Sequence, residues 1–195
     1  YEEDSTEIFK YDEVLFTRKS YDISTEVWKD YYQLIASTNN LISQYENKLI
    51  NQGLFKQQIG EVYFLRAYLY FRLVRLFGNI PLRLDNHVSY SVSLSSFDEI
   101  YNTIISDLSK AYNYLPARSE ITNSFRPHMG VAKFLMAEVY LSWAGYPANN
   151  ASKYIEAYKI SKEVIKDSEI YGFSLISDFR EIWKGTNHQN SETVF

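Results

Sequence analysis

The chain has 195 residues, a formal net charge of −4 and a pI near 5.5. Its hydrophobic fraction of 46% and aromatic fraction of 17% are typical of a folded globular protein and exclude a disordered one. Lys and Arg never cluster beyond a pair, which disfavours nucleic-acid binding, and the absence of Cys excludes disulfides, thiolate metal sites and cysteine nucleophiles.

The first two predicted helices form a hairpin. Apolar residues at helical spacing predict a first helix over about residues 25–50 and a second over about 56–77. Gly78 and Pro81 mark the end of the second helix, because Gly is favoured just beyond a helix C-terminus and Pro cannot continue a helix. A Ser-rich loop follows over residues 79–95.

Three further helices follow this loop. The third begins at a predicted capping box, in which the side chains of Ser96 and Glu99 satisfy reciprocal backbone donors, and it ends before Pro116. The fourth spans residues 128–144 and is apolar nearly all the way round, and the fifth spans about 152–167.

These helices predict hairpins over about residues 25–78, over 96–144 and from 152–167 onward. Because the second helix of each pair is the more apolar, the predicted fold class is all-α, with stacked helical hairpins of the tetratricopeptide type and long irregular loops. We expect residues 1–195 to form a single domain. We also expect this domain to be a portion of a longer protein.

The stretch LRAYLYFRLVRLFGNIPL, residues 65–82, is the most informative part of the chain. It is apolar nearly all the way round, so other helices must cover it, yet Arg66 lies on its most apolar side. A buried guanidinium is costly unless it is paired, so we predict an ion pair with Asp107 or Glu138, with contact to a ligand as the alternative. Asn39 also faces inward, and we predict that its amide bonds to neighbouring backbone and fixes the register of the first hairpin.

The loop after this stretch holds the candidate ligand-binding residues, which are Arg83, Asn86, His87 and Tyr90. They combine an aromatic plane with polar side chains, which is the chemistry that a glycan site needs for ring stacking and for hydrogen bonds to hydroxyls. An ordinary solvated loop is the alternative interpretation. Aromatic residues at helical spacing are instead expected in the core.

The sequence predicts no catalytic residue, no metal site and no cofactor. The three histidines, His87, His128 and His188, stand apart without metal-ligand spacing, and no Gly-rich phosphate loop or nucleophile elbow occurs. No apolar run approaches the length that a membrane span needs.

Residues 65–82 resemble the hallmark helix LRA-x-x-Y-F-x-L-V-R-x-F/Y-G-x-I/V-P-L of the SusD/RagB-like outer-membrane lipoproteins of Bacteroidetes. Residues 97–116, 126–140 and 191–195 are similar to further segments of the family pattern, in the same order. The resemblance covers about three quarters of the chain. It departs from the family in lacking the anchoring Cys and the C-terminal half.

The resemblance implies a lipid-anchored protein on the outer face of the outer membrane that captures oligosaccharides, or peptides in some relatives, for import. It implies a TonB-dependent, SusC-like transporter as partner, which the tetratricopeptide-like helices contact. In this family the loops and the C-terminal half build most of the ligand site.

The leading hypothesis is therefore a non-enzymatic surface glycan-binding protein for nutrient uptake. One rival is a helical-repeat scaffold that binds oligopeptides or docks a partner protein. Another is the helical domain of a carbohydrate-active hydrolase, which two carboxylates facing one groove would favour.

Overall fold

The computed structural model describes residues 18–48, 51–85, 92–121, 126–183 and 191–192. These residues form helices and turns, with no strand among them. The α-helices are α2 (Arg18–Glu46), α3 (Lys56–Phe77), α4 (Phe97–Tyr114), α5 (Met129–Ala144), α6 (Lys153–Lys166) and the short α7 (Ser168–Tyr171). Single 3₁₀ turns lie at Arg118–Glu120 and Phe179–Trp183.

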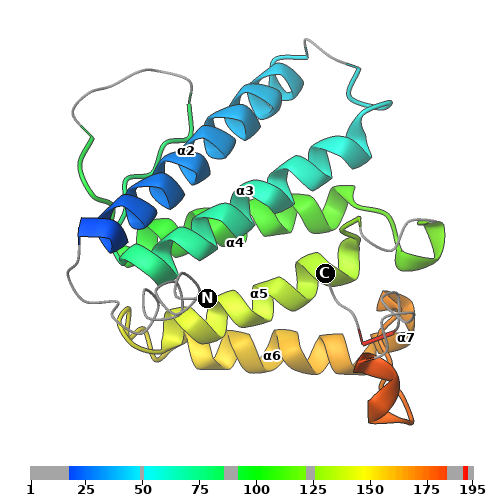
Figure 1. Cartoon of the computed structure of the whole chain (residues 1–195). Helices are drawn as coiled ribbons and strands as arrows, with labels where there is room; N and C mark the ends of the chain where they lie inside the picture. The colour runs from blue at the N-terminus through cyan, green and yellow to red at the C-terminus, as the bar shows by residue number, and fades with distance from the viewer. Residues whose placement is uncertain (1–17, 49–50, 86–91, 122–125, 184–190, 193–195) are drawn as a thin grey trace, which may run out of the picture.

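The helices stack in chain order, each packing against the next from α2 to α6, as Figure 1 shows. The helices α3, α4 and α5 each lie between two neighbours in the stack. Of these, α3 and α5, the second helices of their hairpins, bury a larger share of their residues than α4 does. The prediction of an all-α fold of stacked hairpins is confirmed. None of the helices in the described ranges has both the length and the apolar character needed to cross a membrane.

The predicted start and end of the first helix are wrong. The helix begins at Arg18 instead of residue 25, because its polar first turns carry no apolar period to detect. It ends at Glu46, where Lys48 adopts a positive φ of 56° and the Gln52 side chain donates to the Tyr45 carbonyl at 2.9 Å. Together with the Lys48 N–H, which donates at 3.0 Å, this bond satisfies a carbonyl of the last turn that has no donor four residues further on in the helix.

The centre of α3 is fully enclosed. Ala67, Tyr70 and Leu73 have no exposed surface, and Gly78 ends the helix with a φ of 73°. The capping box of α4 is also present, since the Glu99 N–H donates to the Ser96 hydroxyl at 3.3 Å and the Ser96 N–H donates to the Glu99 carboxylate at 2.7 Å. The local signals for these two helices are therefore confirmed.

Gly60 allows α3 and α4 to approach closely. A Cβ atom at this position would lie 2.9 Å from the Tyr114 Cβ and 3.2 Å from the Leu115 backbone nitrogen. Backbone cannot move aside as cheaply as a flexible side chain can. We therefore expect the steric cost of Gly60→Ala to exceed the roughly 1 kcal/mol that Ala gains over Gly in a helix.

The expected result of Gly60→Ala is a net loss of about 1–2 kcal/mol in the free energy of unfolding, measured by urea denaturation. The matched control is Gly53→Ala, because the nearest atom to its added Cβ lies at an ordinary 3.5 Å. Equal stability of the two variants would show that the contact between α3 and α4 is not limiting.

A candidate binding groove

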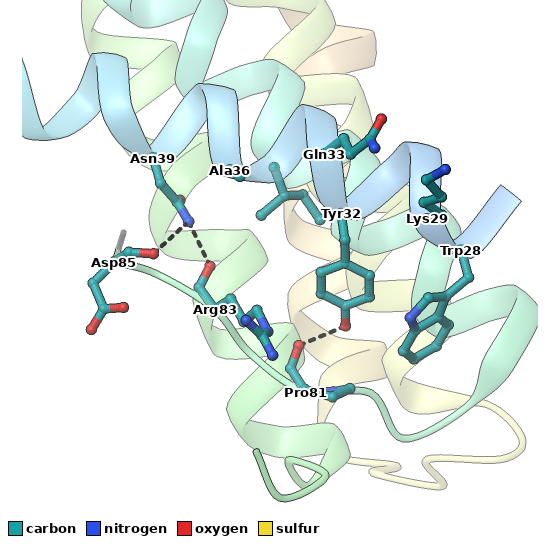
Figure 2. Close-up of a pocket in the computed structure, with 10 residues that line it drawn as sticks. Trp28, Lys29, Tyr32, Gln33, Ala36, Asn39, Pro81, Arg83 and Asp85 are labelled. Atoms are coloured by element: carbon teal, nitrogen blue, oxygen red, sulfur yellow. Dashed lines mark hydrogen bonds between the residues drawn. The ribbon is translucent and has the colours of Figure 1, made fainter. Parts of the chain in front are cut away.

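An open groove of about 520 Å³ runs between the middle of α2 and the extended segment that follows α3. One wall, from α2, presents Trp28, Lys29, Tyr32, Gln33 and Asn39, and the other, from the segment after α3, presents Pro81, Arg83 and Asp85. Figure 2 shows these side chains on either side of the groove. Asn39 and Tyr32 bond across the groove to Arg83 and Pro81, which lie 44 and 49 residues further along the chain.

Two aromatic rings form the α2 side of the groove. Trp28 and Tyr32, one helical turn apart, have ring centroids 4.9 Å apart, and Trp28 also meets Phe77 edge-on at 5.1 Å. The Tyr32 hydroxyl donates to the Pro81 carbonyl at 2.7 Å, and burial raises the pKa of Tyr32, which keeps this hydroxyl protonated. Both rings are half-buried, so each packs on the core and also lines the groove.

Arg83, a predicted ligand-binding residue, lies on the opposite wall. Its backbone N–H donates to the Tyr70 hydroxyl at 2.9 Å, and its carbonyl accepts from the same hydroxyl at 2.6 Å. Burial raises the pKa of Tyr70 to about 12. In Figure 2 the Arg83 side chain extends toward Tyr32. The other three predicted residues, Asn86, His87 and Tyr90, lie outside the described residues.

The groove also contains residues that the sequence pattern does not mark as binding residues. Trp28 and Tyr32 fit the apolar period of α2, which predicts them only as core residues. The signal available for a surface role is that polar Lys29 and Gln33 each follow one of these aromatic residues directly. Such a pattern marks the edge of a buried helix face, where a ring can be half covered.

Behind the groove lies the predicted buried ion pair. The Arg66 guanidinium donates from Nε and Nη2 to the two carboxylate oxygens of Asp107, each at 2.7 Å, and from Nη1 to the Asn39 Oδ1 at 2.8 Å. Arg66 and Asp107 are 6% and 2% exposed. The alternative prediction, that Glu138 pairs with Arg66, is wrong: Glu138 lies at the surface of α5 and pairs with Arg75 at 3.1 Å.

Burial acts against the charges of this pair, and the contacts between the partners oppose that effect. For Arg66 the hydrogen bonds and the negative charge of Asp107 prevail over burial, so its pKa is raised. Burial raises the pKa of Asp107, and the bonds from Arg66 limit that rise. Two short parallel bonds favour the ionised form of such a pair near neutral pH.

Asn39 connects the ion pair to the groove wall. Its Nδ2 donates to the Arg83 carbonyl at 2.8 Å and to the Asp85 carbonyl at 3.4 Å, while its Oδ1 accepts from Arg66. The predicted bond from this amide to neighbouring backbone is therefore present. It holds the segment after α3 against α2.

A second, more polar hollow of about 340 Å³ lies beside the groove and shares Asn39 and Asp85 with it. Glu46 is a second carboxylate in this hollow, and it accepts from the Tyr63 hydroxyl at 2.6 Å and from the Lys110 ammonium at 3.1 Å. The Tyr63 bond is the main reason that the pKa of Glu46 is lowered, against the effect of burial. Glu46 thus lacks the raised pKa that a glycosidase acid requires.

No cluster of three or more His, Asp or Glu side chains that could hold a metal ion occurs in the part of the chain that the structure describes. The groove instead offers ring faces, amide groups and a guanidinium. These groups bind ligands by stacking and hydrogen bonding. The fold and the groove together define a helical-repeat protein with a polar and aromatic binding surface.

Residues 3–141 match the sequence pattern of a SusD-like family described as starch-binding and associating with the outer membrane. The chain therefore belongs to the SusD-like family. A SusD-like protein of Bacteroides ovatus is 26% identical over 175 residues, which are 86% of this chain and 31% of that protein.

Solved structures of similar proteins share the fold. A SusD homologue from Bacteroides thetaiotaomicron aligns with a TM-score of 0.76 and 28% identity, over 87% of this chain and 34% of that one. A laminarin-binding SusD-like protein aligns with a TM-score of 0.72 and 27% identity, over 87% of this chain and 36% of that one. The chain thus spans about a third of the length of these relatives.

Proposed function

We propose that this chain is the N-terminal helical domain, residues 1–195, of a cell-surface protein that binds oligosaccharides without catalysis. The observation that carries the proposal is the family match over residues 3–141, whose description names starch binding and the outer membrane. The similar protein named as laminarin-binding supports a glycan as the ligand class. Localisation to the outer face of the outer membrane through a lipid anchor belongs to the same proposal.

The groove between α2 and the segment after α3 contributes to this binding. The rings of Trp28 and Tyr32 offer faces on which sugar C–H groups can pack, and Arg83 offers several donors in a fixed plane for hydroxyl or ring oxygens. Asn86, His87 and Tyr90, which follow Arg83 in the sequence, complete the proposed contact set. Binding of this kind needs no metal and forms no covalent bond.

The first test is binding of laminarin, starch and xyloglucan, by affinity electrophoresis and calorimetry, to this chain and to any longer product of its gene. We expect saturable binding of at least one glycan. Binding of oligopeptides with no glycan binding would instead favour the helical-repeat scaffold. Release of reducing sugar would contradict the non-enzymatic part of the proposal.

The residue-level prediction concerns Arg83→Ala. We expect it to weaken glycan binding about tenfold, which is the loss of one charge-assisted hydrogen bond, and to leave thermal stability unchanged. Arg72→Ala is the matched control, because Arg72 is an exposed arginine of α3 that does not line the groove. Equal affinity of the two variants would remove Arg83 from the binding site.

The transporter partnership is also proposed. A TonB-dependent, SusC-like transporter would receive the ligand from this protein, with the stacked helices as the docking surface. Co-purification of the two proteins from outer membranes after mild detergent extraction is the expected result. A transporter that purifies alone under the same conditions would count against the partnership.

A further inference from the structure

Asn39 occupies an unusual position in the molecule, at the point where the buried ion pair meets the groove wall. Its side chain is 2% exposed, although it lines the groove at the groove's inner end. Its side-chain hydrogen bonds go to other elements: to Arg66 of α3, and to the carbonyls of Arg83 and Asp85. One amide thus joins α2, α3 and the segment after α3.

The segment that carries Arg83 belongs to no helix or strand, and side chains of the helices fix its path. Tyr32 of α2 bonds the Pro81 carbonyl, and Tyr70 of α3 bonds both the N–H and the carbonyl of Arg83. Asn39 adds a second bond to the Arg83 carbonyl and reaches Asp85. The backbone of Arg83 is therefore held on both of its polar groups.

The charge of the ion pair strengthens this connection. Arg66 is bound by Asp107 of α4 through two of its nitrogens, so its third nitrogen has a fixed direction toward the Asn39 Oδ1. An oxygen that accepts from a cation makes the amide N–H₂ group at the other end a better donor, because bonds in a chain polarise one another. The pair in the core thereby orients the amide that holds the groove wall.

We propose that Asn39 and Tyr70 are positioning residues for oligosaccharide binding, and that they act through Arg83. This inference rests on the proposed function. A wall that is already ordered does not have to be ordered when the ligand binds, so the rigid backbone of Arg83 increases affinity. Asp107 and Arg66 support the arrangement from the core without touching the ligand.

The sharpest test is Asn39→Asp. The carboxylate keeps an acceptor for Arg66 and has nearly the same shape, but it cannot donate to the carbonyls of Arg83 and Asp85. One of its oxygens would face those two carbonyl oxygens, and like partial charges repel. The substitution therefore separates the role of Asn39 in satisfying Arg66 from its role in holding the groove wall.

Tyr70→Phe tests the second positioning residue, since it removes only the hydroxyl that bonds Arg83. Its matched control is Tyr63→Phe, which removes a hydroxyl from the same helix that bonds Glu46 and Lys110 and does not line the groove. With laminarihexaose as the probe, we expect about tenfold weaker binding for Asn39→Asp and Tyr70→Phe. For Tyr63→Phe we expect a change of less than about twofold.

A positioning role also predicts non-additive effects. If Asn39 acts through Arg83, then Asn39→Asp should cause little further loss of affinity once Arg83→Ala is present. Loss by the same factor in both backgrounds would overturn the proposal.

Amide hydrogen exchange supplies a readout that needs no ligand. We expect the amide of Arg83 to exchange at least about tenfold faster in Asn39→Asp and Tyr70→Phe, with the amides of α3 unchanged. Unchanged exchange at Arg83 would overturn the positioning role. If the wild-type chain binds no oligosaccharide, the proposed function fails, and the exchange rates still decide whether these residues hold the wall.

Discussion

Replacing Arg66 with Leu is expected to lower the free energy of unfolding by about 3–5 kcal/mol, because it leaves the buried Asp107 carboxylate without its partner. Asp107 is 2% exposed and both of its oxygens accept from Arg66 at 2.7 Å. The substitution also removes the donor to the Asn39 Oδ1. Urea denaturation followed by circular dichroism measures the change, as a shift of the midpoint at constant m-value.

Arg75→Leu is the matched control for this substitution. Arg75 lies on the same helix and bonds Glu138 at 3.1 Å, but its side chain is 49% exposed. An exposed ion pair contributes at most about 1 kcal/mol, so we expect this variant to remain close to the wild type. Similar losses in the two variants would contradict the special cost of the buried site.

The double variant Arg66→Leu with Asp107→Leu separates an unpaired charge from lost packing. Removing both charges takes away the uncompensated carboxylate, so we expect the double variant to be more stable than Arg66→Leu alone. A double variant that is as unstable as the sum of the single ones would show that the cost lies in packing. The ion pair would then be a minor contributor.

The sequence predicted the hairpin stack and the burial of α3 because both follow from local periodicity. The apolar period of α3 requires cover on most sides, and Gly78 and Ser96 provide the local end signals of their helices. The inward positions of Arg66 and Asn39 follow from the same helical geometry. A polar residue on an apolar face must find a partner, which is a physical requirement independent of the fold.

The choice between partners could not be made from the sequence. Asp107 and Glu138 both lie beside apolar residues of their helices. The apolar period shows which face of a helix is buried, but not which neighbouring helix that face contacts. The structure places α4 against the Arg66 side of α3 and turns Glu138 toward solvent. Which helix packs against the Arg66 side of α3 is a property of the tertiary structure, and this determines which carboxylate Arg66 meets.

The groove was only partly predictable for a related reason. The sequence identifies Arg83 because it has polar and aromatic neighbours outside a predicted helix, whereas the helical spacing of Trp28 and Tyr32 predicts core residues. For these two half-buried rings that prediction describes only the face that packs on the core. Which rings line a groove depends on where the segment after α3 crosses α2, and bonds from Tyr32 and Asn39 to its carbonyls determine that crossing.

We expect His128 to make the fold sensitive to mild acid. It is 3% exposed, and its Nδ1 accepts from the Gly130 N–H at 3.2 Å, which caps the start of α5. Its ring packs against Phe173, with centroids 5.6 Å apart. Burial, with a smaller contribution from the positive charge of Arg118, lowers the pKa of His128 to about 4.

The direction of the pH effect follows from this lowered pKa. In the unfolded chain the imidazole titrates near its ordinary pKa of about 6.5, so between pH 6.5 and pH 4 only the unfolded chain binds the proton. The free energy of unfolding therefore falls as the pH is lowered through this window, by up to about 3 kcal/mol, and levels off below pH 4. Above pH 6.5 the contribution of His128 is constant.

His128→Asn is the variant that isolates this effect, because Asn is a good N-cap and does not titrate. Denaturation of both proteins between pH 4 and pH 8 gives two stability profiles, and all other titrating groups contribute equally to both. We expect the difference between the profiles to grow as the pH falls below 6.5. Parallel profiles, or a His128 ring resonance that titrates near pH 6.5 in the folded protein, would show that the buried cap is not the acid-sensitive element.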